Sequence, residues 1–143
     1  AFWKYNIATN SWTQLPNVPG TVNGGAMAYD GSGNFYALQG NDVNAFWKYN
    51  IATNSWTQLP NVPGTVNGGA MAYDGSGNFY ALQGNGTTAF WKYNVNTNIW
   101  YTGAAAPAPI PGTVNGGAMA YDGSGNFYAL QGNGTSAFWK YTP

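Results

Sequence analysis

The chain repeats itself almost without error. Of its 143 residues, 1–41 are identical to 45–85, which sets a repeat period of 44. A third unit begins at Ala89, departs from the pattern over 95–110 and rejoins it from Pro111, and a fourth begins at residue 137. We therefore treat 1–143 as one repeat domain, with units 1–44, 45–88 and 89–136 and a partial unit 137–143.

A period in the forties is typical of solenoids and propellers, and the residues of each unit favour strands over helices. Paired glycines and an Asp-Gly-Ser-Gly segment leave no room for a helical stripe of apolar residues. Four short strands are predicted per unit, which we call a to d: strand a at 25–29, b at 35–39, c at 2–5 and again at 46–49, and d at 11–14. Each is aromatic or apolar on both faces, as in a sheet that lies between neighbouring sheets.

The connections between these strands can be predicted too. The segment DGSGN at 30–34 predicts a tight turn from strand a to b, because its glycines tolerate positive φ and Asp30 and Asn34 can bond the turn backbone. NIATNS at 6–11 joins c to d in the same way, and the proline-bearing stretch 15–25 leads to the next strand a. In the third unit the divergent segment 99–110 predicts a longer loop between strand d and the next strand a. Four antiparallel strands and a longer return make one propeller blade.

This order of strands resembles the kelch repeat. An inner strand opens with small residues (GGAMAY), an aromatic second strand ends in glycine (FYALQG), and a Tyr is followed seven residues later by a Trp. These pairs are Tyr5 with Trp12, Tyr49 with Trp56, and Tyr93 with Trp100. Gln39-Gly40 stands where kelch repeats have two glycines, and DGSGNFY is also similar to NHL-type repeats. The resemblance implies an all-β, kelch-like β-propeller with three four-stranded antiparallel blades per chain.

The predicted strand order, cd, abcd, abcd and abc, leaves the ring of blades open. Propellers typically have about four to eight blades, so three would expose an apolar sheet face at each end. We predict that oligomerisation of identical chains completes the ring, with six blades in a dimer or nine in a trimer. The residues expected to close the blade between chains are Phe2, Trp3, Tyr5, Trp12, Phe138, Trp139 and Tyr141.

Strand c occurs once too often at each such junction, as AFWKY at 1–5 and at 137–141. The two copies are expected to compete for one place, so that one of them is displaced or disordered. The alternative is that these three blades are cut from a longer natural ring. Identity over 41 residues is typical of very recent duplication or of deliberate consensus design, which fits a symmetric designed propeller or a fragment of one.

The composition offers little chemistry. Four Lys and four Asp are the only charged residues, and His and Cys are absent, which excludes Ser-His-Asp triads and removes the commonest metal ligand, histidine. In the turns of Asp30, Asp74 and Asp122 a structural role is favoured over a calcium loop, because no bidentate Glu follows. We expect no enzyme activity, cofactor or metal and, with zero net charge, no nucleic-acid or membrane partner. No leader or membrane-spanning run is visible, which predicts a soluble chain without a targeting signal.

Aromatic side chains are the remaining functional candidates. They could stack on sugar rings, with glycans as the ligand of a multivalent, lectin-like propeller. The candidate stacking residues are Trp3, Tyr5, Trp12, Trp47, Tyr49, Trp56, Trp91, Tyr93 and Trp100. In the competing interpretation these large side chains fill the space between the blades of a structural scaffold that has no ligand. Because every unit offers the same side chains, the repetition favours the self-assembling scaffold.

Overall fold

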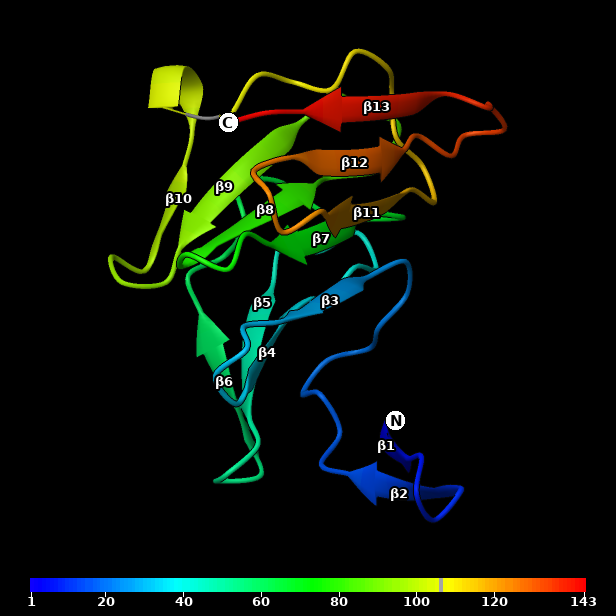
Figure 1. Ribbon diagram of the computed structural model, residues 1–143, viewed down its shortest axis with the longest axis vertical. Coiled ribbons are helices and arrows are strands. Elements are labelled where there is room, and N and C mark those ends of the chain that lie inside the picture. The colour runs from blue at the N-terminus through cyan, green and yellow to red at the C-terminus, as the bar shows by residue number, and fades with distance from the viewer. Residues whose placement is uncertain (106) are drawn as a thin grey trace.

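The computed structural model describes residues 1–105 and 107–143, which form an all-β fold of four antiparallel sheets (Figure 1). The strands are β1 (Phe2–Asn6), β2 (Ser11–Leu15), β3 (Ala26–Tyr29), β4 (Asn34–Leu38), β5 (Phe46–Asn50), β6 (Ser55–Leu59), β7 (Ala70–Tyr73), β8 (Asn78–Leu82), β9 (Phe90–Asn94), β10 (Ile99–Tyr101), β11 (Ala118–Tyr121), β12 (Phe127–Leu130) and β13 (Phe138–Tyr141). They pair as the hairpin β1-β2, the four-stranded sheets β3-β4-β5-β6 and β7-β8-β9-β10, and the three-stranded sheet β11-β12-β13.

The predicted strands are confirmed to within about one residue at each end. Strand a is observed as β3, b as β4, c as β1 and β5, and d as β2. Within each sheet a fixed register pairs them, with Phe46 of strand c lying between Leu38 of strand b and Leu59 of strand d. The described sheets therefore have the predicted content, cd, abcd, abcd and abc, and they do not close into a ring within one chain.

The DGSGN turn is held by its own aspartate. Asp30 Oδ1 accepts hydrogen bonds from the backbone nitrogens of Ser32 (2.7 Å) and Asn34 (3.0 Å), and Asp30 Oδ2 accepts one from the Asn34 side chain (2.7 Å). Gly33 adopts a φ of 94°, a conformation that residues with a side chain rarely take. The turns of the other two units repeat the same three bonds. Each carboxylate is therefore engaged in holding its turn.

The three copies of strand a, β3, β7 and β11, lie side by side in a row (Figure 1). Just before these strands, paired glycines bring neighbouring backbones together: Gly69 N donates to Gly24 O (3.2 Å) and Gly116 N donates to Gly68 O (3.0 Å). A Cβ on Gly24 would lie 2.5 Å from the backbone nitrogen of Gly68. Glycine is therefore required where one sheet meets the next.

The core lies between successive sheets. Side chains of β3–β6 pack against those of β7–β10, which pack in turn against β11–β13. At each of these two seams a Tyr of strand b packs against a Phe of the next strand b with tilted rings: Tyr36 against Phe79 and Tyr80 against Phe127, both with ring centroids 4.3 Å apart. The sheet β7–β10 has a neighbour on each side, which explains why its strands are apolar on both faces.

The third unit departs from the pattern after β10. A short 3₁₀ turn, η1 (Gly103–Ala105), follows the strand, and identity with the other units resumes at Pro111. Ile110 is buried and stands where Val62 is buried one unit earlier. The longer loop predicted here is observed, apart from Ala106, which lies outside the described residues, and the helical turn was not predicted.

Candidate functional site

The aromatic residues considered for ligand stacking differ according to their place in the chain. Tyr49, Trp91, Tyr93 and Trp100 are buried, Trp47 and Trp56 are half-buried, and Trp3, Tyr5 and Trp12 are exposed. The buried copies bind neighbouring units together, since Trp100 donates its indole N–H to Pro60 O (3.1 Å) in the preceding unit. No sugar ring can reach these four side chains, so the hypothesis of a stacking site in every unit needs correction.

The exposed copies lie in the hairpin β1–β2. The rings of Trp3 and Trp12 line a shallow cavity of about 420 Å³. Tyr5 donates its hydroxyl hydrogen to Asn10 Oδ1 (2.6 Å), as Tyr49 does to Asn54 Oδ1 (2.6 Å). Because Tyr49 makes the same bond while buried, the exposure of Tyr5 comes from the absence of a preceding sheet within the chain.

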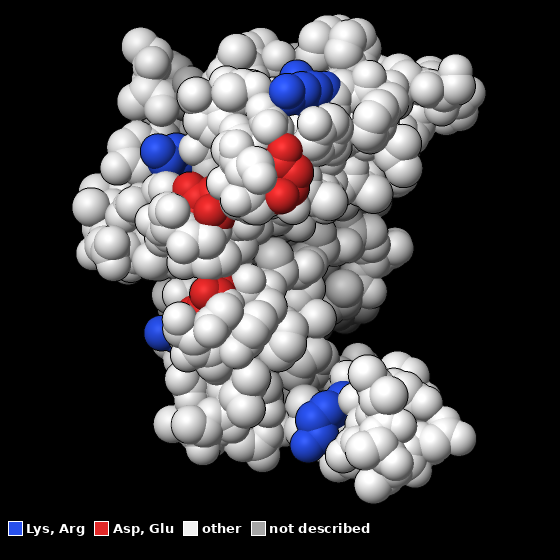
Figure 2. Space-filling view, in the orientation of Figure 1, with Lys and Arg blue, Asp and Glu red and all other residues white. Residues whose placement is uncertain are grey.

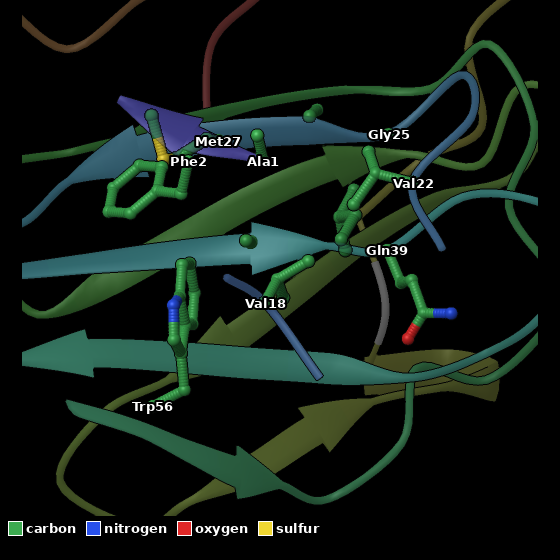
Figure 3. A pocket seen from close by; sticks show the side chains of 11 residues that line it. Ala1, Phe2, Val18, Val22, Gly25, Met27, Gln39 and Trp56 are labelled. Carbon is green, nitrogen blue, oxygen red and sulfur yellow. The ribbon is translucent and has the colours of Figure 1, made fainter. Parts of the chain in front are cut away.

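The apolar surface around Val18, Val22, Met27 and Phe35 we call the N-terminal open face. Val18, Val22 and Met27 line a cavity of about 240 Å³, in which Phe2 and Trp56 complete the apolar wall (Figure 3). A second cavity, of about 590 Å³, shares Phe2 and Met27 with the first and runs between the hairpin β1–β2 and the sheet β3–β6. The two cavities form a hollow where strands a and b of a preceding unit would lie.

In the second unit, the residues equivalent to those of the N-terminal open face lie in the hydrophobic core. Val66 is 1% exposed whereas Val22, in the same sequence context, is 55% exposed. Met71 and Phe79 are likewise buried, covered by Tyr36 and Leu38 of the preceding strand b. The N-terminal open face is therefore a core surface without its covering strands.

The surface around Tyr128, Leu130 and Phe138 we call the C-terminal open face. Leu130 is 54% exposed, although Leu82 at the same position is 1% exposed. Phe138 is exposed too, whereas Phe46 and Phe90 are buried. Tyr128 and Leu130 belong to strand b, one of the two strands that the N-terminal open face lacks, and Phe138 belongs to strand c.

The residues predicted to close a blade between chains occupy two kinds of place. Trp3, Tyr5, Trp12 and Phe138 are exposed at the chain ends. Phe2, Trp139 and Tyr141 are half-buried within the chain. The Phe2 ring lies 5.0 Å from that of Tyr49, and Tyr141 lies 5.0 Å from Phe90. The rings of Phe2 and Tyr141 thus already make edge contacts with aromatic rings of their own chain.

Among the described residues, backbone hydrogen bonds form at the two seams within the chain but not between its ends. Val66 N donates to Val43 O (3.0 Å), and Val114 N donates to Thr87 O (2.8 Å). By repeat equivalence the third such pair is Val22 with Thr135, which lie at opposite ends of the chain and do not bond to each other in the part of the chain described here. Similarly, a Cβ on Gly116 would meet nothing within 4 Å, although one on Gly24 would contact the next glycine pair.

Carboxylates gather along one face of the molecule (Figure 2). A wide cavity of about 930 Å³ there is lined by the turns that hold Asp30 and Asp74 and by Tyr121. Burial raises the pKa of Asp30, but hydrogen bonds from Asn34 and Ser32 outweigh it, so the net pKa lies below its usual value. Among residues 1–105 and 107–143, no three His, Cys, Asp or Glu side chains are grouped to hold a metal ion, and no helix could span a membrane.

Comparison with known proteins supports the fold. No protein-family model matches the chain, and no curated protein matches it. Among the solved structures that match, one described as the structure of YjhT, a propeller-like protein, superposes with a TM-score of 0.64 at 23% sequence identity. The match covers 80% of this chain and 35% of YjhT, so the chain spans about a third of that protein's length. The likeness shows an all-β fold of the propeller type.

Four non-aromatic residues of the open faces were missed by the sequence analysis: Val18, Val22, Met27 and Leu130. Attention to large aromatic residues passed over these aliphatic side chains. The sequence did contain a signal for them, namely their place in the repeat. Each has a repeat equivalent that is buried between two blades, and each lies in the first or last complete unit, which lacks a complete neighbouring unit on one side. To use this signal, one must know the order of the blades in the chain as well as the type of each residue.

Proposed function

We propose that the chain is a structural, self-assembling segment of a kelch-type propeller whose identical copies join end to end into a closed ring. Two copies would make six four-stranded blades, and three would make nine. One observation carries the proposal: each open face consists of residues whose repeat equivalents are covered at a seam within the chain. The role requires no catalytic group and no cofactor.

The contact between copies can be derived from the seams within the chain. Tyr36 packs against Phe79 and Tyr80 against Phe127, so Tyr128 would pack against Phe35 of the next copy. Leu130 would then enter the hollow beside Val22 and Met27 of the next copy, as Leu38 and Leu82 enter the two internal seams. Burial of such side chains is worth roughly 1.5–3 kcal/mol each.

Backbone hydrogen bonds would extend across the same contact. Val22 N of the next copy would donate to Thr135 O, as Val66 N and Val114 N do within the chain. Gly25 N of the next copy would donate to Gly116 O, as Gly69 N does to Gly24 O. Polar backbone groups at the rim of an apolar face would thereby gain partners.

This contact joins two different surfaces, so it either closes into a ring or continues as a filament, according to the rotation per copy. The sheets of the chain fan out around the row β3, β7 and β11 (Figure 1), which favours a ring. Apolar sheet faces of this size are seldom left in water by monomers, which favours closure over separate chains.

A matched pair of variants tests this proposal. Leu130→Asp places a charge on the C-terminal open face, and Ile99→Asp is the control, because both side chains are 54% exposed and the other units carry Ser11 and Ser55 at the position of Ile99. By size-exclusion chromatography with light scattering, Ile99→Asp should keep the oligomeric mass, and Leu130→Asp should have the chain mass of 15.2 kDa. An oligomer of unchanged mass for Leu130→Asp would exclude this face as the contact.

Glycan binding is the second candidate, and the exposed rings of Trp3 and Trp12 favour it. Trp12 would be covered on ring closure, as Trp100 is, so this binding would be strongest in the separate chain. Titration of simple sugars while tryptophan fluorescence is followed, with Trp12→Ala as the control, tests it. Binding that survives in Trp12→Ala, or no binding at all, would contradict a stacking role for Trp12.

A further inference from the structure

Strand c is present at both ends of the chain, as β1 and as β13, although a four-stranded blade has one place for it. Both copies run in the same direction, so inserting both between strands b and d would create a parallel pair in an antiparallel sheet. It would also move β2 outward by one strand spacing, about 4.8 Å. Ring closure therefore requires that one copy leaves the sheet.

The hairpin β1–β2 is a complete copy of the c–d hairpins inside the chain. Its register runs from Phe2 opposite Leu15 to Asn6 opposite Ser11, as Phe46 to Asn50 do with Leu59 to Ser55. Asn6 Oδ1 accepts the backbone N–H of Ala8 (2.9 Å) in the turn. The hairpin thus brings strand d, the connecting turn and strand c to the junction as one unit.

β13 is an incomplete copy at its C-terminal end. In the two four-stranded sheets an asparagine ends strand c and donates its side-chain N–H to strand b, from Asn50 to Asn34 and from Asn94 to Asn78, both at 2.8 Å. At the end of β13 the corresponding residue is Thr142, whose hydroxyl bonds Asn126 (2.8 Å). β1 carries the asparagine, as Asn6.

The residue that follows strand c also differs between β1 and β13. Ile51 N donates to Gly33 O (3.0 Å) and Val95 N donates to Gly77 O (2.9 Å), which fastens strand c to the turn between a and b. Pro143 occupies this position after β13 and has no N–H to donate. Ile7 occupies it after β1 and has one.

The remaining contacts of β13 can be taken over by β1. Tyr141 lies 6.1 Å from Tyr80 and 5.0 Å from Phe90, as Tyr93 lies 6.2 Å from Tyr36 and 5.0 Å from Phe46. Tyr5, the equivalent residue of β1, is exposed. Replacing β13 by β1 of the next copy would therefore keep these aromatic contacts, exchange the Thr142 bond for one from Asn6, and add the backbone hydrogen bond that Pro143 cannot make.

We propose that β13 is a placeholder strand, which covers β12 in the separate chain and is displaced by the β1–β2 hairpin of the next copy during assembly. The inference rests on the ring closure proposed above and names the strand that closes it. Because the loop 131–137 tethers β13 to β12, the placeholder competes at high effective concentration and restrains assembly. Weakening β13 should therefore promote the oligomer, and weakening β1 should abolish it.

Equivalent substitutions in the two copies test this. Tyr141→Asp weakens β13 and Tyr5→Asp weakens β1, and both are compared with wild type by light scattering over a dilution series. We expect Tyr141→Asp to lower the concentration of half-assembly by about tenfold, which corresponds to about 1.4 kcal/mol, and Tyr5→Asp to be monomeric throughout. The reverse order, equal loss in both or no change in either would overturn the exchange. A monomeric wild type would instead overturn the ring itself.

Cysteine pairs provide a second readout, since the chain has no native cysteine. Ala129 lies opposite Trp139 in the β12–β13 pair, and by register it would lie opposite Trp3 of the next copy. Oxidation of the assembled Ala129→Cys/Trp3→Cys variant should give covalently linked chains on a non-reducing gel. If the assembled Ala129→Cys/Trp139→Cys variant forms an intrachain bond while the first variant forms none, β13 stays in place and the proposal is wrong.

Discussion

The first two units are identical over 41 residues and yet differ in what surrounds them. The hydrogen bond from Tyr5 to Asn10 has the same length as that from Tyr49 to Asn54, so the local turn does not depend on place. Burial does depend on it: Tyr5 is exposed and Tyr49 is buried. Local structure therefore follows from the unit, whereas the core follows from having a neighbouring unit.

The strongest test of this contrast compares Leu82→Ala with Leu130→Ala. Leu82 is buried between two sheets, so its truncation should cost about 2–5 kcal/mol of unfolding free energy at any protein concentration. Leu130→Ala should cost less than about 1 kcal/mol in dilute protein and more once the chains assemble. Urea unfolding at two protein concentrations measures both values. If the two variants lost the same unfolding free energy in the dilute samples, the proposed distinction between the middle sheet and the end sheet of the chain would be wrong.

The paired glycines give a second comparison. Gly68 and Gly116 have φ of 64° and 67°, so alanine brings similar backbone strain, on the order of 1 kcal/mol, at either position. A Cβ on Gly68 would also collide with the backbone of Gly116, whereas one on Gly116 meets open space in the chain. Gly68→Ala should therefore lower the urea midpoint more than Gly116→Ala, and Gly116→Ala should instead block oligomer formation. Normal assembly of Gly116→Ala would contradict the contact proposed between copies.

Alkaline pH should act mainly through the middle of the molecule. Burial raises the pKa of Tyr80 and of Tyr93 to about 12, against about 10 for an unfolded chain. Because the folded state retains these protons more tightly, their contribution to stability is fully present below about pH 10 and is lost as the pH rises towards 12. Urea unfolding between pH 8 and pH 12 should show this loss, and Tyr93→Phe should reduce its slope. A slope that Tyr93→Phe leaves unchanged would assign the loss to other groups.

The strands and turns were predictable because short-range features determine them. DGSGN encodes a turn through glycine φ values and the Asp30 carboxylate, and strands of apolar residues on both faces indicate stacked sheets. The open faces were less predictable, since exposure of Val22 or Leu130 depends on which sheets lie next to them in space. The difference between β1 and β13 depends on Ile7 and Pro143, whose importance appears only with the bonds of Ile51 and Val95 in view.

The mass of the unmodified chain in solution tests the joining of identical copies most directly. Light scattering at two protein concentrations should give two or three times the chain mass of 15.2 kDa at the higher one, with no larger species. A discrete dimer would indicate six blades, and a discrete trimer would indicate nine. The mass of a single chain at both concentrations would contradict assembly, and a mass that grows without limit would contradict closure of the ring.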